Sequence, residues 1–311
     1  MTGGTGFIGG RLGSHLKETG NSLIIATRYP HRYISQKDNI VRHPQTGFSS
    51  EGNGTGVQYV PLQDDMSEFI MGCRVIINLA GESLLGKRWT PRVRKRLYDS
   101  RIRTTQSVVN SIKHLERKPD LMISVSGVDY YGDTGKALVT EKNKAGKGFL
   151  ADLCREWEFA AMEAESQGVR VVIPRFGIIL GREGGALPVM IPVFKAFLGG
   201  SIGPGSQFFP WIHIRDLCRT VLFAMENDHI TGPFNAVAPN PVTMDDFAVA
   251  LGRVLSRPSL FKIPEFVLKI VLGEAAGMMT GSHRICPDKL QETGFSFEYP
   301  KIGDALSDLL L

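Results

Sequence analysis

Cysteine is scarce in this sequence, and long apolar runs are missing. The four cysteines, Cys73, Cys154, Cys218 and Cys286, lie far apart, so they suggest neither a disulfide framework nor a CxxC metal or redox pair. No apolar stretch reaches the length of about 18 residues that a membrane-spanning helix needs. These features favour a reducing compartment, with neither a bound metal nor a membrane partner. We therefore expect a cytoplasmic protein, with the mitochondrial matrix as the alternative location.

Concentrated charge is also lacking. The 311 residues carry a formal net charge of +5, but it is spread thinly, without a lysine-rich tail or alternation of basic and aromatic residues. Nucleic acid is therefore not an expected partner. Hydrophobic residues make up 42% of the chain and charged residues 22%, which is ordinary for a globular protein of enzyme size.

Apolar, β-branched runs alternate with helical patterns along the first half of the chain. The runs predict strands at residues 22–27, 57–61, 74–79, 121–125 and 169–173, and the helical patterns lie at 7–19, 92–115 and 149–167. Strands that are apolar throughout are typical of a parallel sheet covered by helices on both faces. We therefore expect an α/β fold with a doubly wound parallel sheet in residues 1–174. Frequent glycine and proline residues between short elements predict a smaller C-terminal substrate lobe in residues 175–311.

A glycine-rich turn stands at the start of the chain. Gly3, Gly6 and Gly9 have the spacing GxxGxxG, and a predicted helix follows from Phe7 and Ile8 onward. Such a turn lets the backbone bend tightly and approach a pyrophosphate, which the N–H groups at the helix start then bind. Tight packing alone is the alternative explanation. The order of turn, helix and second strand favours a Rossmann-type dinucleotide-binding domain.

The strand that should precede this turn is truncated. Only Met1 and Thr2 come before Gly3, whereas a doubly wound fold needs a full, central first strand. We expect the natural protein to begin several residues upstream.

No acidic residue follows the second predicted strand until Asp38. An acidic side chain at this point would bind the 2′-hydroxyl of the adenosine ribose, whereas a cation accommodates a 2′-phosphate. The strand ends in Thr27 and Arg28, and arginine fits a phosphate with two hydrogen bonds. NADP(H) is thus the expected cofactor, unless Arg28 is only a solvated charge at the strand end.

The strand at residues 74–79 ends in Asn78, Leu79, Ala80 and Gly81. The carboxyl ends of the strands in such a sheet border its ligand crevice, so we expect this segment to lie beside the dinucleotide. The alternative is that Asn78 only forms a turn after the strand.

Together these residues resemble the extended short-chain dehydrogenase/reductase superfamily. Further motifs resemble its atypical branch called epimerase family protein, of the family 39U, member 1 type, and the likeness covers essentially the whole chain. They are Arg88-Trp89-Thr90, Asp99-Ser100-Arg101, Tyr130-Tyr131-Gly132, Trp157-Glu158, residues 207–214 and residues 294–300, the last within a family-specific segment at about 257–305.

The resemblance implies an NADP-binding fold and assigns several site residues. Thr27 and Arg28 would lie at the adenosine end, and Leu79 and Ala80 beside the ribose. Arg96 and Arg101, on the helix after the strand at 74–79, and Ile179, near the nicotinamide, would complete the cofactor site. Arg96 and Arg101 belong to a basic run, so the alternative is a solvated helix face.

The catalytic tyrosine and lysine of this superfamily are absent. These residues normally lie one helical turn apart, and their places fall on Leu150 and Cys154. Ser126 still supplies a hydroxyl, and Tyr130 or Tyr131 could replace the proton donor. The alternative is that these three residues only pack a loop.

These residues predict an NADP-dependent oxidoreductase or epimerase-like enzyme that acts on a small-molecule substrate and uses a non-standard acid. The alternative is a catalytically silent NADP(H)-binding sensor or regulatory protein. The identity of the substrate and the oligomeric state stay open.

Overall fold

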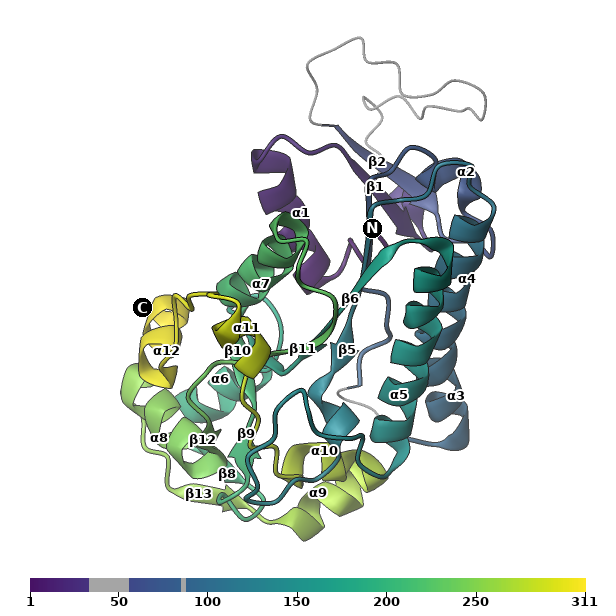
Figure 1. The fold of residues 1–311 in the computed structure, drawn as a ribbon. Helices are drawn as coiled ribbons and strands as arrows, with labels where there is room; N and C mark the ends of the chain where they lie inside the picture. Colours follow the sequence, from purple (N-terminus) through teal and green to yellow (C-terminus); the bar gives the residue numbers. More distant parts are fainter. Residues whose placement is uncertain (34–55, 85–87) are drawn as a thin grey trace.

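A computed structural model describes residues 1–33, 56–84 and 88–311 of the chain. Its central feature is a parallel sheet (Figure 1). On one side β3 pairs with β4, β4 with β6 and β6 with β11; on the other side β1 pairs with β2. The strands are β1 (Leu23–Thr27), β2 (Val57–Pro61), β3 (Val75–Asn78), β4 (Leu121–Ser124), β6 (Arg170–Phe176) and β11 (Gly232–Ala236).

Met1 and Thr2 join the two parts of the sheet. The Thr2 amide donates to the Ile77 carbonyl (2.9 Å), and the Ala26 amide donates to the Met1 carbonyl (2.9 Å). Thr2 therefore bridges β1 and β3 in parallel register, at the central position of the sheet. The resulting order is β2, β1, Met1-Thr2, β3, β4, β6 and β11, which confirms the doubly wound fold. An apolar cavity next to Met1 lies between β1, β3 and α4.

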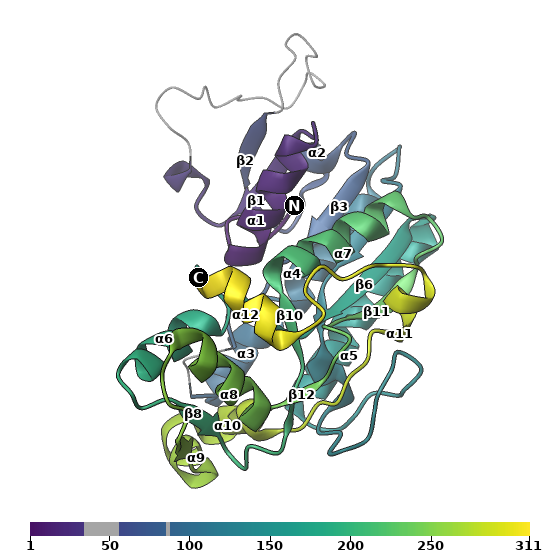
Figure 2. The same cartoon turned by 90° about the vertical axis from the view of Figure 1, so that its left-hand side faces the viewer.

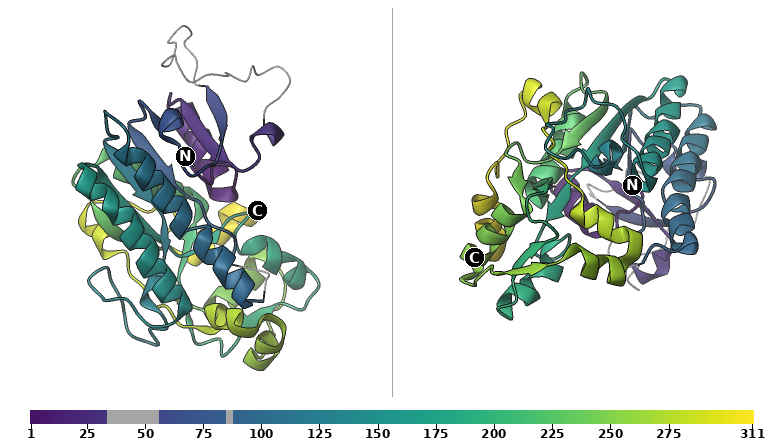
Figure 3. Two further views of the ribbon diagram at one scale, coloured as in Figure 1. Left: turned by 90° about the vertical axis from the view of Figure 1, so that its right-hand side faces the viewer. Right: turned by 90° about the horizontal axis from the view of Figure 1, so that it is seen from below.

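Helices cover both faces of this sheet. One face carries α1 (Phe7–Glu18) and α7 (Ile214–Glu226), which lie in front of the strands in Figure 2. The other carries α4 (Ile102–Lys113) and α5 (Phe149–Met162), the blue and teal helices in the left view of Figure 3. The short α2 (Ser67–Ile70) and α3 (Pro91–Asp99) flank α4.

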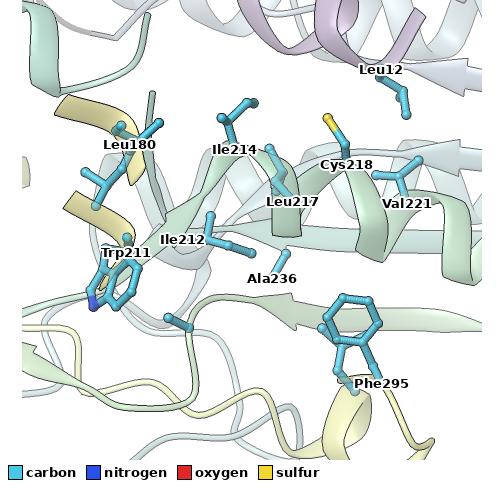
Figure 4. Packing of buried hydrophobic residues seen from close by; sticks show 14 of the residues in the cluster. Leu12, Leu180, Trp211, Ile212, Ile214, Leu217, Cys218, Val221, Ala236 and Phe295 are labelled. Carbon is cyan, nitrogen blue, oxygen red and sulfur yellow. The ribbon is translucent and has the colours of Figure 1, made fainter. Parts of the chain in front are cut away.

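Both faces are apolar because successive strand residues point to opposite sides. Ile77, Ile123 and Val172 join the core below α1 and α7, whereas their neighbours Ile76 and Met122 join the core below α4. Figure 4 shows part of the first core, in which side chains of α1, α7, β10 (Trp211–His213) and β11 lie near Phe295 of the C-terminal segment. The labelled residues include Leu12, Ile212, Leu217, Val221, Ala236 and Phe295. This burial explains the continuous apolar runs in the sequence.

Two predicted helices end earlier than their patterns suggested. The pattern at 92–115 forms two helices, α3 and α4, because Arg101 leaves regular helical geometry (φ −106°, ψ −62°) and its side chain bonds back to the Leu97 carbonyl. The pattern at 149–167 ends as a helix at Met162 and continues as the 3-10 turn η3 (Glu163–Gln167).

The predicted division between residues 174 and 175 falls inside a strand. The strand β6 runs through it to Phe176, and β11 and α7, both from the second half, complete the sheet and one helical layer. Part of residues 175–311 therefore packs with the sheet of the first half, because β11 forms hydrogen bonds with the edge of β6.

The rest of the second half lies beyond the carboxyl ends of the strands. No helix in the described part of the chain is long and apolar enough to cross a membrane. The elements beyond the strand ends form small strand pairs and the helices around them. They are β7 (Ile178–Leu180), α6 (Leu187–Lys195), β8 (Gly200–Ile202), β9 (Phe208–Phe209), β10 (Trp211–His213), β12 (Val242–Thr243), α8 (Met244–Leu255), β13 (Phe261–Ile263), α9 (Glu265–Leu272), α10 (Ala276–Thr280), α11 (Asp288–Glu292) and α12 (Ile302–Leu310).

Candidate functional site

The glycine turn needs glycine at two of its three expected positions for space. Gly3 has φ +66°, and a Cβ there would lie 2.6 Å from the Leu79 carbonyl oxygen. A Cβ on Gly9 would lie 2.4 Å from the Gly3 carbonyl oxygen. At Gly6 the nearest contact would be 3.3 Å, which is tight but less severe. The turn is therefore packed against the carboxyl end of β3, as a cofactor turn must be.

The start of α1 is open to an anion. No side chain caps the helix at Gly6, and its first turn has no acidic residue. The Phe7 ring lies under the 181–185 loop, where a Cβ on Gly181 or Gly184 would come within 2.3 or 2.4 Å of it. A Cβ on Gly185 would lie 2.1 Å from the Ile179 carbonyl oxygen. Phe7 and Ile179 are thus brought to one place, although they come from opposite halves of the chain.

Arg28 lies at the carboxyl end of β1, directly after the buried Thr27. Its side chain is exposed and forms no ion pair or hydrogen bond within residues 1–33, 56–84 and 88–311. The guanidinium is therefore available to a ligand. Since β1 is adjacent to the turn in the sheet, this cation stands at the edge where the adenosine end of a dinucleotide would lie.

The side chain of Asn78 does not face the site as predicted. It is fully buried and accepts a hydrogen bond from Thr2 Oγ1 (2.6 Å). Its Nδ2 donates to Thr105 Oγ1 (2.8 Å) and Ser124 Oγ (3.0 Å). The amide therefore joins three parts of the fold, because a buried amide must satisfy its own donors and acceptors. Only the backbone after it, at Leu79, Ala80 and Gly81, borders the turn.

Arg101 is a buried anchor rather than a member of a solvated face. It is 8% exposed, and its guanidinium donates to the carbonyls of Leu97 (3.1 Å) and Glu82 (3.0 Å). A Cβ on Gly81 would lie 3.2 Å from Arg101 Cζ, so the guanidinium covers this glycine. Arg96 is exposed and pairs with Glu82 at 3.4 Å. Both arginines therefore stabilise the segment that follows β3.

The hydroxyl of Tyr131, one of the two expected proton donors, is engaged inside the protein. This hydroxyl donates to Asn235 Oδ1 (2.7 Å) and accepts from Arg175 (2.7 Å), and the residue is 5% exposed. Burial raises the pKa of Tyr131 to about 12, although the charge of Arg175 opposes the shift. The hydroxyl is thus held in the interior. Its partners lie 44 and 104 residues away in sequence, so the local pattern could not reveal them.

The Tyr131 contact belongs to a buried network that sequence reasoning missed. Arg175 binds Glu158 with two hydrogen bonds, of 2.8 and 2.7 Å, and its guanidinium lies 3.5 Å from the centre of the Tyr130 ring. The Tyr130 hydroxyl forms no hydrogen bond in the described part of the chain. Its proposed role therefore stays a prediction. The signal for the network was Glu158, a carboxylate that lies among the buried positions of α5.

Ser126 begins β5 (Ser126–Gly127), which pairs with β6. It is 4% exposed, and its hydroxyl has no hydrogen-bond partner among the described residues. Cys154, on α5, lies beside it, and burial raises the pKa of this thiol to about 12. Leu150, one turn earlier, packs in two apolar clusters. Neither Leu150 nor Cys154 supplies a proton at neutral pH.

A carboxyl group also lies at this end of the sheet. Asp129, in the 3-10 turn η2 (Val128–Tyr131), is partly exposed, and burial raises its pKa although His283 and Arg101 oppose the shift. Sequence reasoning did not select Asp129, because His283 comes from a distant segment. Among the described residues, no group of three or more His, Cys, Asp or Glu side chains could hold a metal ion.

Comparisons with known proteins agree with this geometry. Residues 1–236 match the model of the NAD dependent epimerase/dehydratase family, and residues 263–309 match a domain of unknown function, DUF1731. The second match overlaps most of the family-specific segment expected at about 257–305.

Similar proteins span the whole chain. A chloroplastic epimerase family protein SDR39U1 homologue from Arabidopsis thaliana is 36% identical over 312 residues, which cover 100% of this chain and 86% of the relative. Epimerase family protein SH2119 from Staphylococcus haemolyticus is 36% identical and is covered to 98%. A crystal structure of human epimerase family protein SDR39U1 (isoform 2) with NADPH is similar over 99% of this chain and 97% of that one. Its TM-score is 0.83 at 30% identity.

Proposed function

This chain belongs to the NAD dependent epimerase/dehydratase family, and on that premise we propose that it is an NADP(H)-dependent oxidoreductase or epimerase-like enzyme. The observation that carries the choice of NADP(H) is the exposed guanidinium of Arg28 at the carboxyl end of β1, which has no partner among the described residues. The similar human protein, whose structure contains NADPH, supports the same choice.

The residues at the edge of the sheet fit this cofactor. Gly3 and Gly9 let the turn pack closely against the end of β3 and against itself, and the uncapped start of α1 would offer N–H groups to a pyrophosphate. Leu79 and Ala80 would border the ribose, and Ile179 would border the nicotinamide. When bound, NADPH would supply a hydride; the chain would bind it, orient it and supply the proton.

Substitution of Arg28 tests the cofactor proposal. Arg28→Asp places a carboxylate against the 2′-phosphate and removes charge-assisted hydrogen bonds worth about 1.5 to 3 kcal/mol, so NADPH affinity should fall about 10- to 150-fold. Affinity for NADH, which lacks the phosphate, should change little. Fluorescence titration with both cofactors measures the difference.

Arg117→Asp provides the control, because it makes the same charge change at an exposed position of the opposite edge, after α4. Salt screens so distant a charge. The proposal fails if the unmodified protein binds NADPH and NADH equally, or if both substitutions weaken NADPH binding to the same extent.

A catalytically silent NADP(H) sensor is the second candidate. The observation that favours it is that the Tyr131 hydroxyl is held in the buried network. The resemblance, which puts the places of the usual tyrosine and lysine on Leu150 and Cys154, supports the same candidate. Consumption of NADPH in the presence of 9,10-phenanthrenequinone, a reactive dicarbonyl, would exclude a silent protein. Tight NADPH binding without any consumption would favour it.

A further inference from the structure

Asp129 lies beside Cys154, the expected place of the missing lysine. A Cβ built on Gly127 would be 3.6 Å from Asp129 Oδ2 and 3.7 Å from Cys154 Sγ. The carboxyl group and the thiol therefore face the same side of Gly127, and Ser126 precedes Gly127 on β5. Asp129 thus brings an acidic side chain to the segment that carries Ser126 and next to the helix that carries the expected pair.

The carboxyl group of Asp129 forms no ion pair or hydrogen bond with another residue of the described segments, and the residue is partly exposed. Its own backbone N–H favours the charged form, as do the cations nearby. Two other acids are held by other residues: Glu158 binds Arg175, and the Glu141 carboxylate accepts from the Asn235 amide (2.8 Å). The carboxyl group of Asp129 is therefore not tied to a distant part of the fold.

Charged and titratable groups from three other elements surround Asp129. Arg101 lies at the start of α4, Cys154 on α5, and His283 in the segment after α10. Arg101 and His283 favour the carboxylate, but burial has the larger effect and raises the pKa of Asp129. A raised pKa keeps the acid protonated to a higher pH than an ordinary aspartate, which is what a proton donor requires.

We propose that Asp129 is the general acid of this protein and replaces the missing tyrosine. The proposal rests on the NADP(H)-dependent function proposed above. In the reduction of a ketone or aldehyde, bound NADPH would supply the hydride that the carbonyl carbon accepts. The Asp129 carboxyl donates its proton to the carbonyl oxygen, so that an alcohol forms, NADP⁺ remains and Asp129 becomes a carboxylate. Solvent reprotonates it, because the residue is partly exposed.

The assignment predicts how activity depends on pH. Reduction should be fastest while Asp129 is protonated, and it should decline as the pH rises through the raised pKa of Asp129. In the reverse direction the carboxylate acts as base, so oxidation of an alcohol should improve over the same range. A phenol donor would lose activity only at a much higher pH.

Two measurements on the full chain test the proposal. Infrared difference spectra of the wild type and Asp129→Asn, recorded across the pH range without cofactor, should show a protonated carboxyl signal that persists above the normal aspartate range and is absent from the variant. In assays of NADPH-dependent reduction of 9,10-phenanthrenequinone, Asp129→Asn should lower kcat about 100-fold or more, as expected for loss of a general acid. Asp129→Glu should retain part of the activity.

Asp152→Asn is the matched control, since it removes the same charge from a partly exposed position on α5. It should leave both the infrared signal and kcat unchanged. NADPH affinity and melting temperature, measured for every variant, separate lost chemistry from lost binding or folding.

Three outcomes would overturn the assignment: a carboxyl that titrates like an ordinary aspartate, turnover that survives Asp129→Asn with its pH profile intact, or a wild type that does not reduce the quinone. In the last case, tight and selective NADPH binding would still uphold the cofactor part of the proposed function.

Discussion

The buried pair between Glu158 and Arg175 should be a large contributor to stability, and Glu158→Gln tests this. Arg175 is 2% exposed, and both oxygens of Glu158 accept hydrogen bonds from its guanidinium. The substitution keeps the size of the side chain but leaves the arginine charge buried without its counter-charge. Breaking a buried pair from one side typically costs about 3 to 5 kcal/mol.

This loss should be readily measured by thermal unfolding. Unfolding entropy is about 2.1 cal/mol/K per residue, or about 0.65 kcal/mol/K for a chain of this length, so 3 to 5 kcal/mol corresponds to a fall in Tm of about 5 to 8 °C. Glu156→Gln is the control on the same helix. Glu156 is exposed, and its contact with the Tyr98 hydroxyl should contribute under about 1 kcal/mol.

Replacing both Glu158 and Arg175 separates the effect of the unpaired charge on stability from the effect of side-chain packing. Glu158→Leu combined with Arg175→Met removes the unpaired charge, so the double variant should be more stable than Glu158→Gln. If Glu158→Gln lowers Tm no more than Glu156→Gln, the pair does not stabilise the fold as we argue. A double variant less stable than the single one would show that volume and hydrogen bonds matter more than charge.

Two further predictions concern the glycine turn and the thiol near Ser126. Gly9→Ala should destabilise the turn and weaken NADPH binding at least 10-fold, because its Cβ would lie 2.4 Å from the Gly3 carbonyl oxygen. Gly10→Ala should be tolerated, because a Cβ there would have no atom within 4 Å. Titration of both variants with NADPH distinguishes the two effects. Cys154 should resist iodoacetamide at pH 8 in the folded protein. Its pKa, raised from 9.0 to about 12 by burial, lowers the thiolate fraction about a thousandfold, so rapid labelling of native Cys154, detected by peptide mass spectrometry, would contradict the buried site.

The sequence by itself determined the type of fold and the location of the cofactor turn. Apolar strands that alternate with helical patterns identified a parallel sheet covered on both faces. Strands that are buried on both sides are apolar at every position, so they are visible as continuous apolar runs. The turn at Gly3, Gly6 and Gly9 was recognised from the spacing of its glycines. A Cβ on Gly9 would meet the nearby Gly3 carbonyl, and a Cβ on Gly3 would meet the Leu79 carbonyl after β3. Arg28 followed from its position after a strand.

Only the tertiary structure decided the roles of the polar side chains. Asn78, Arg101 and Tyr131 were assigned to the site by sequence, yet their hydrogen bonds are largely made inside the protein. Asp129 had no sequence signal, and the structure places it beside Gly127 and Cys154. A local pattern reports whether a segment is buried, but the environment of a charge depends on groups that long-range packing brings to it. His283, 154 residues after Asp129 in sequence, reaches the same charged cluster only when the chain is folded.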